Sequence, residues 1–85
     1  MKIDSQSPDI EFEFGRSLRI LREAKGWSQE ELADQCGIHR TYVSQLERGL
    51  KSPTLRLLWA ICDSLSIKPS DYIQQMEKTM EGRVA

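Results

Sequence analysis

Residues 28–49 read SQEELADQCGIHRTYVSQLERG, and this stretch decides the fold. Ser28, followed three residues later by Glu31, forms a capping-box pattern in which each side chain can satisfy the other residue's backbone amide. Gly37 comes nine residues after Ser28 and can adopt the left-handed conformation that ends many helices. The pattern therefore predicts a helix over 29–36 that stops at a sharp turn.

A second helix is predicted directly after that turn. Residues 40–48 carry helical spacing and are followed by Gly49, so only residues 37–39 separate the two helices. Such a tight crossing needs a small side chain, and Ala33 provides one. The apolar residues recur where both helices would face a common core, at Leu32, Cys36, Ile38, Val43 and Leu46.

Three further helices flank this pair. The spacing predicts one over 12–25, one that opens with Ser52-Pro53 as its N-cap and first turn, and one that opens at Lys68-Pro69. No stretch shows the alternation typical of a strand, so we predict an all-α fold of five helices. We expect a domain over 12–78 with flexible tails over 1–11 and 79–85. The apolar face of the fourth helix should contain Leu55, Leu58, Ile61, Cys62 and Leu65.

Charge is distributed unevenly along the chain. The 85 residues carry 12 Lys and Arg against 13 Asp and Glu, a net charge of −1. Segments 15–27 and 39–51 are basic, whereas 1–14 and 28–38 are acidic. A positive surface is therefore compatible with the slightly negative total.

Several classes of protein are disfavoured by what the sequence lacks. A chain of this length is one small domain, without room for a cleft between two domains, and it has no recognisable nucleophile–base or paired-carboxylate arrangement. We expect no enzyme activity. Cys36 and Cys62 lie far apart in apolar helical contexts and His39 is the single histidine, so we expect reduced thiols, no metal and no cofactor. The N-terminus carries no signal-peptide stretch, and we expect a cytoplasmic protein with no membrane partner.

The exposed face of the helix over 40–48 can be derived from its periodicity. At about 100° per residue, its polar residues lie on one side and Val43 and Leu46 lie opposite them. An arginine fork matches guanine O6 and N7, and a glutamine amide matches adenine N6 and N7. The polar face that contains Arg40 and Gln45 is therefore suited to reading base edges.

These residues resemble the helix-turn-helix of lambda-type phage repressors, Cro proteins and the wider XRE family of bacterial regulators. The resemblance rests on residues 28–33, 41–49 and 53–55 and extends over about residues 14–76. It implies a lambda repressor-like fold and sequence-specific binding of double-stranded DNA for transcription regulation. The implied base-contacting residues are Arg40, Thr41, Ser44 and Gln45. Gln29 is implied to contact phosphate, and by position we assign Tyr42, Arg48 and Lys51 to the phosphate backbone as well.

The resemblance also implies an ion pair between Arg22 and Glu47, which we interpret as structural. We expect His39 to be an entry residue of the third helix. Trp27 should lie at a helix junction and be partly buried.

A homodimer on a palindromic operator is the expected assembly, because one helix of this length touches only a few base pairs. We expect its interface on the fourth and fifth helices, at Leu57, Trp59, Tyr72, Ile73 and Met76. The size resembles that of restriction–modification controller proteins, although other short XRE regulators and antitoxins are similar. We expect no sensor domain and no small-molecule ligand. The alternative is a protein-interaction adaptor or antitoxin component with the same fold, whose third helix would present an apolar or acidic face.

Overall fold

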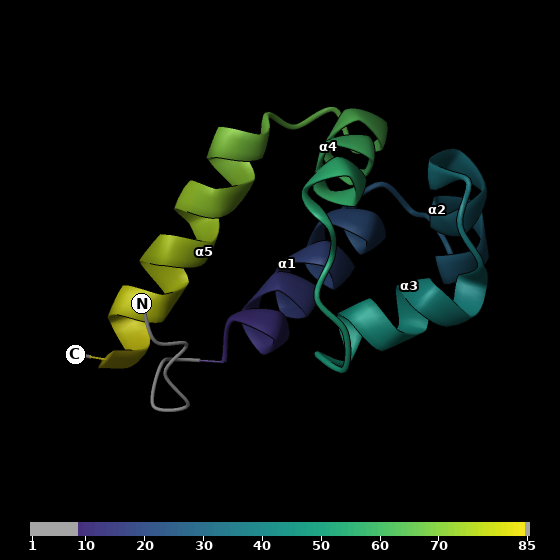
Figure 1. Cartoon of the computed structure of the whole chain (residues 1–85). Helices are drawn as coiled ribbons and strands as arrows, with labels where there is room; N and C mark the ends of the chain where they lie inside the picture. The colour runs from purple at the N-terminus through teal and green to yellow at the C-terminus, as the bar shows by residue number, and fades with distance from the viewer. Residues whose placement is uncertain (1–8, 85) are drawn as a thin grey trace.

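Five helices make up the part of the chain that the computed structural model describes, residues 9–84. In chain order they are α1 (Ile10–Ala24), α2 (Gln29–Cys36), α3 (Arg40–Glu47), α4 (Leu55–Ser64) and α5 (Pro69–Val84) (Figure 1). No strand occurs within residues 9–84, so the predicted all-α fold class is confirmed. The predicted tail lies outside the described residues over 1–8, and so does residue 85.

The ends of α1 and α2 follow from local capping. The carboxylate of Asp9 accepts a hydrogen bond from the backbone N–H of Phe12 at 3.0 Å, so α1 begins two residues before the predicted position. The capping box before α2 is closed in both directions. The Ser28 hydroxyl accepts the N–H of Glu31 at 3.0 Å, and the Glu31 carboxylate accepts the N–H of Ser28 at 2.8 Å. The predicted bounds of α2 are confirmed.

The start of α4 differs from the prediction, and α5 runs past the expected domain boundary. Thr54, rather than Ser52, caps α4, because its hydroxyl accepts the N–H of Leu57 at 3.0 Å. Pro53 therefore lies before the helix instead of in its first turn. α5 continues through residues 79–84, and Met80 still packs against the core, so no helix end coincides with the domain boundary expected after residue 78.

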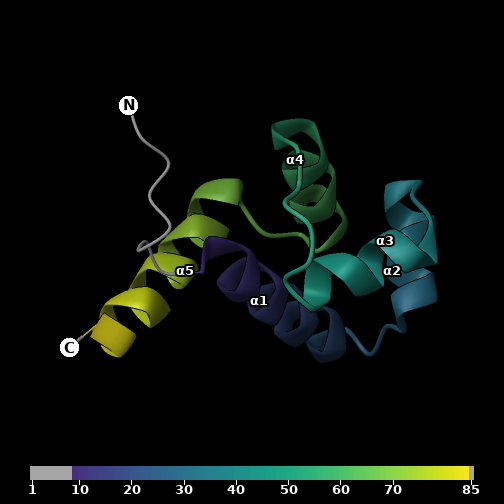
Figure 2. The ribbon, with the colours of Figure 1, turned by 60° about the horizontal axis from the view of Figure 1, so that its bottom comes forward.

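The helices pack around α1, which runs between the two ends of the molecule. α1 contacts α3 on one side and α5 on the other, and α4 contacts both α2 and α5. Figures 1 and 2 show α5 at one end and the α2–α3 pair at the other. The buried apolar core draws on all five helices and consists of Phe14, Leu18, Leu32, Ala33, Val43, Leu46, Leu57, Leu58, Ile61, Cys62, Leu65, Tyr72 and Met76.

The apolar stripe of α5 is used inside the protomer, which corrects the predicted dimer interface. The Tyr72 hydroxyl donates a hydrogen bond to the Phe14 carbonyl at 2.6 Å, and the two rings stack with centroids 4.9 Å apart. Tyr72, Met76 and Leu57 are 0%, 5% and 8% exposed. These three residues are core residues. They are buried because α5 packs its apolar face on α1 and α4 of the same protomer.

The structure leaves a different apolar set on the surface of α4 and α5. Trp59 and Ile73, the other two residues of the predicted interface, are 56% and 39% exposed. Leu55, which we expected on the buried face of α4, is 71% exposed. α4 begins later than predicted, so Leu55 is its first residue and is not part of its buried face.

None of the helices within residues 9–84 combines the length and the apolar character that a membrane crossing requires.

Candidate nucleic-acid interface

The turn between α2 and α3 is built by backbone geometry at Gly37. This residue has φ +69°, and a Cβ added there would meet no atom within 4 Å. Gly37 is therefore required for its left-handed conformation rather than for space. The N–H of Ile38 then bonds back to the Ala33 carbonyl at 3.0 Å, which closes the end of α2.

His39 begins α3 as its N-cap. Its Nδ1 accepts a hydrogen bond from the backbone N–H of Thr41 at 3.0 Å, and the ring is exposed. The prediction of a helix-entry residue is thus confirmed. This capping interaction satisfies one of the free backbone N–H groups at the start of α3.

The rotation of α3 about its axis is fixed by two apolar anchors. Val43 and Leu46 are both fully buried in the core, as predicted from the periodicity. On the other side, Arg40 and Thr41 are exposed, while Ser44 and Gln45 are half-buried. The four residues predicted to contact bases are therefore brought together on one helix, with polar groups at its surface.

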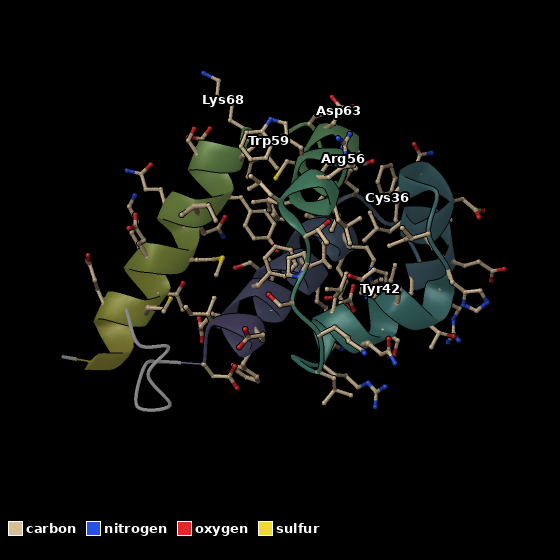
Figure 3. The ribbon with its side chains drawn as sticks, viewed as in Figure 1. Cys36, Tyr42, Arg56, Trp59, Asp63 and Lys68 are labelled. Atoms are coloured by element: carbon tan, nitrogen blue, oxygen red, sulfur yellow. The ribbon has the colours of Figure 1, made fainter. Side chains whose placement is uncertain are left out.

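Of the four residues predicted to contact phosphate, two are exposed and two are half-buried. Arg48 and Lys51 are exposed at the end of α3 and in the loop after it, and the Arg48 Nε donates to the Ser44 carbonyl at 3.4 Å. Tyr42 is half-buried and packs against the core, so only part of this side chain is accessible (Figure 3). Gln29, at the start of α2, is also half-buried.

An ion pair joins α1 to the end of α3, as predicted. The Arg22 Nε and Nη2 donate to the two oxygens of Glu47 at 2.6 and 3.0 Å, and both side chains are nearly buried. Hydrogen bonding to Glu47 raises the pKa of Arg22 above its usual value. The Arg22 Nη1 also donates to the Trp27 carbonyl at 2.6 Å, so the same guanidinium holds the loop that leads into α2.

Sequence reasoning missed that Gln29 belongs to this network. Its Nε2 donates to Glu47 Oε1 at 3.0 Å, so Glu47 connects α1, α2 and α3 through its two oxygens. This bond uses one of the two N–H groups of the Gln29 amide. No short-range sequence signal reveals this contact, because the two residues are 18 positions apart.

Sequence reasoning also missed the close approach of α1 to α3 at Gly15. A Cβ added to this residue would lie 2.1 Å from the carbonyl oxygen of Leu46 and 2.7 Å from that of Glu47. Gly15 therefore allows the backbone of α3 to rest directly on α1. The available signal was a glycine inside a helix, which costs about 1 kcal/mol relative to alanine and calls for a packing reason.

The exposed charged residues of α3 and of the loop after it are positive. Arg40, Arg48 and Lys51 are exposed, whereas the Glu47 carboxylate is neutralised by Arg22. The exposed acids of α2, Glu30 and Asp34 among them, belong to the other helix of the pair. The polar face of α3 is thus bordered by cations that can approach an anionic ligand.

Among the described residues, the cysteines, the possible metal ligands and Trp27 provide no further site. Both cysteines carry free thiols, and burial raises the pKa of Cys62 to about 11. Within residues 9–84, His, Cys, Asp and Glu form no group of three or more that could hold a metal ion. Trp27 is half-buried at the α1–α2 junction, as predicted, with the Lys25 ammonium 5.3 Å from its ring centroid.

Comparison with protein families and curated proteins gives consistent matches. Residues 18–73 match the helix-turn-helix family (HTH_3). The control protein C.BamHI of Bacillus amyloliquefaciens is 38% identical over 66 residues, which is 76% of this chain and 82% of the relative.

Solved structures are similar over most of the chain. The restriction-modification controller protein C.AhdI from Aeromonas hydrophila is 40% identical, with a TM-score of 0.71 over 73% of this chain and 94% of that one. The clp gene regulator ClgR from Corynebacterium glutamicum is 30% identical, with a TM-score of 0.85 over 91% and 82%. The controller protein C.Esp1396I, solved as a tetramer with its natural 35 base-pair operator, is 25% identical, with a TM-score of 0.76 over 84% and 93%.

Proposed function

This chain belongs to the helix-turn-helix family, and on that premise we propose that it is a transcriptional regulator that inserts α3 into the major groove of a specific DNA sequence. The observation that carries the proposal is the division of α3 into two faces. Val43 and Leu46 anchor the helix in the core, and the polar face stands out on the opposite side. A helix held in this way can enter a groove without losing contact with its own domain.

The side chains of the polar face supply base readout. Arg40, exposed in the first turn of α3, has the fork that matches guanine O6 and N7. Gln45 can pair with the N6 and N7 of adenine, and the hydroxyls of Thr41 and Ser44 bond to either kind of base edge. The Thr41 methyl group can additionally contact the methyl group of thymine.

Phosphate contacts position this face on the duplex. Arg48 and Lys51 carry exposed cations beyond the polar face, where the DNA backbone would run. The Gln29 amide has one N–H remaining after its bond to Glu47, and it presents this group from the start of α2. Tyr42 contacts the phosphate backbone with the part of its side chain that is accessible.

The proposal includes a symmetric homodimer on a near-palindromic operator. Two recognition helices related by a two-fold axis contact half-sites about 34–36 Å apart, one turn of B-DNA. The assembly of C.Esp1396I on its operator supports an oligomeric DNA-bound form for a relative of this fold. In this chain the exposed apolar residues Trp59, Ile73 and Leu55 are available for the contact between protomers.

A protein-interaction adaptor would require a different α3. The adaptor hypothesis requires an apolar or acidic face on α3, whereas this face is polar, contains Arg40 and is bordered by Arg48. The one acid of α3, Glu47, is engaged by Arg22 and Gln29. The charge of the exposed surface therefore favours a nucleic-acid partner.

Selection of bound sequences from a random pool of duplex DNA tests the proposal. We expect a near-palindromic sequence to be enriched and to bind roughly 10³-fold or more tightly than random DNA. Its affinity should fall linearly with salt on logarithmic axes, because phosphate contacts release counterions. Equal affinity for the selected and the random duplexes would reject sequence-specific binding.

A further inference from the structure

One face of α4 is left uncovered by the other helices. Within residues 9–84, a shallow groove on this face is lined by five residues at helical spacing, Leu55, Arg56, Trp59, Ala60 and Asp63. Leu55 and Trp59 are 71% and 56% exposed, and the charged residues are exposed as well. Figure 3 shows Arg56, Trp59 and Asp63 together at an edge of the molecule away from Tyr42 on α3.

The apolar part of this face continues onto α5. A second groove shares Leu55 and Trp59 with the first and is completed by Leu58, Pro69 and Ile73, among others. A connected apolar surface of this kind marks a contact with another molecule more often than do single exposed apolar residues.

The order of charges along the face favours a second copy of this chain as the occupant. Arg56 and Asp63 lie at the two ends, and the bulky Trp59 and the small Ala60 lie between them. The midpoint of Arg56 and Asp63 in the sequence is also the midpoint of Trp59 and Ala60. When such a face is turned by 180° about this midpoint, each cation meets an anion, and the two copies of Trp59 come together beside the axis.

We propose that α4 pairs antiparallel with α4 of a second copy of this chain, about a two-fold axis that passes between Trp59 and Ala60. Arg56 of each copy pairs with Asp63 of the other, and the two Trp59 indoles pack against each other beside the axis. This inference deepens the proposed homodimer and rests on it. An isologous contact requires a self-complementary patch, and this face has that property.

The distances along the helix are compatible with the pairing. Arg56 and Asp63 each lie three to four residues from the midpoint, or about 5 Å along the axis at 1.5 Å per residue. At this distance from the crossing point, two helices diverge by only a few ångströms at common crossing angles, which a long arginine side chain can span. Both ion pairs can therefore form around the apolar centre.

The position of the face agrees with a DNA-bound dimer. α4 packs on α2 and α5, and α3 packs on α1 and α2. A partner seated on the exposed face of α4 therefore leaves the polar face of α3 free. Ile73, at the border of the second groove, lies where it can add apolar area to the same contact.

Charge exchange between the two ends of the face tests the proposal. In R56E, each new glutamate faces Asp63 of the other copy, and in D63R each new arginine faces Arg56. Because two ion pairs become two repulsions, we expect the dimer dissociation constant to rise roughly tenfold or more in either variant. The double variant R56E/D63R restores opposite charges and should dimerise like the wild type.

An equimolar mixture of the two single variants gives the sharpest readout. A mixed dimer places the new glutamate against the new arginine and Arg56 against Asp63, so both contacts are attractive. In sedimentation velocity at low salt, the mixture should dimerise although neither variant does so alone. K78E, which reverses an exposed charge on α5 away from this face, should sediment like the wild type.

The outcomes separate this interface from the proposed function. A dimeric wild type whose single variants are equally dimeric would reject the α4 pairing and leave the homodimer in place. A wild type that is monomeric at all concentrations would reject both the homodimer and this pairing, whereas binding of the selected half-site by the monomer would leave DNA recognition standing. Variants that are monomeric alone and also in the mixture would reject the pairing.

Discussion

At the scale of single residues, the side chains of α3 differ in how strongly the protein holds them. Arg40 is exposed and has its guanidinium free to enter a groove, whereas Arg48 lies beside the Ser44 carbonyl at the end of the helix. Ser44 and Gln45 are half-buried and sit closer to the body of the domain. These differences in placement lead to different roles in DNA binding.

Replacing the two arginines separately should distinguish base readout from phosphate contact. We expect Arg40→Ala to cost about 1–3 kcal/mol of binding free energy on the selected sequence and to relax the preference at one base pair. Arg48→Ala should weaken binding to all sequences nearly equally and reduce the salt slope by about one. Fluorescence anisotropy on selected and random duplexes provides the measurement. Equal losses on both duplexes for Arg40→Ala would remove Arg40 from base readout.

Tyr72 is a residue whose ionisation should affect stability. Burial raises the pKa of this phenol well above its usual value of about 10, and its hydroxyl donates to the Phe14 carbonyl. The folded state therefore keeps the proton that the unfolded state loses above about pH 10. The stability that the neutral phenol provides is present below that pH and is lost as the pH rises above it.

Tyr72→Phe checks this linkage. We expect the variant to lose about 1 kcal/mol of unfolding free energy at pH 7, because the buried hydrogen bond is removed. Between about pH 10 and 11 the difference from the wild type should shrink. Urea denaturation of both proteins across this range gives the answer. A constant difference over the whole range would show that the phenol titrates alike in the folded and unfolded states.

At the scale of helices, the contact between α1 and α3 positions the recognition face. Gly15 lets the α3 backbone lie against α1, and the Arg22–Glu47 pair fastens the same two helices nearby. Gln29 adds α2 to this contact through Glu47. The three helices that form the interface are therefore coupled by one glycine and one carboxylate.

Gly15→Ala should separate the two helices even though alanine is the better helix former. The added methyl group would lie 2.1 Å from the Leu46 carbonyl oxygen, so α1 must move. Crowding should outweigh the gain of about 1 kcal/mol from helix propensity. We expect a net loss of roughly 2–3 kcal/mol of unfolding free energy.

Gly26→Ala is the matched control. Gly26 has φ +74°, but a Cβ there would meet no atom within 4 Å, so this change costs only the strained conformation, about 1 kcal/mol. Thermal and urea unfolding of the two variants compares crowding with backbone strain. If Gly15→Ala is no less stable than Gly26→Ala, the close approach of α1 and α3 is wrong.

At the scale of the whole molecule, the two proposed binding surfaces belong to different helices. The polar face lies on α3, and the exposed apolar residues Leu55, Trp59 and Ile73 lie on α4 and α5. α2 and α5 connect to each other through α4, which packs on both. This arrangement lets one chain bind DNA and a second copy together.

Ile73→Glu should weaken the dimer while leaving the protomer folded. Ile73 is 39% exposed, so a charge can reach solvent in the monomer but would be buried in the dimer. We expect the variant to sediment as a monomer at micromolar concentration and to bind a palindrome little better than a half-site. Gln74→Glu introduces a negative charge at the next, exposed residue and should behave like the wild type. A dimeric Ile73→Glu protein would exclude this part of α5 from the interface.

The sequence by itself determined the features that depend on neighbours along the chain. The capping box at Ser28 and Glu31 and the left-handed Gly37 are local, and the predicted bounds of α2 agree with the structure. The rotation of α3 also followed from local periodicity, because Val43 and Leu46 recur at the spacing of one buried face.

Only the tertiary structure decided which helix covers which apolar face. Tyr72 was predicted at a surface between protomers, yet it is buried against Phe14, 58 positions away in the chain. Periodicity shows that a helix has an apolar stripe, but a neighbouring helix and a second protomer bury such a stripe equally well. The contacts of Gly15 and Gln29 escaped prediction for the same reason. They arise where helices cross, and a crossing depends on the packing of the whole chain rather than on its local sequence.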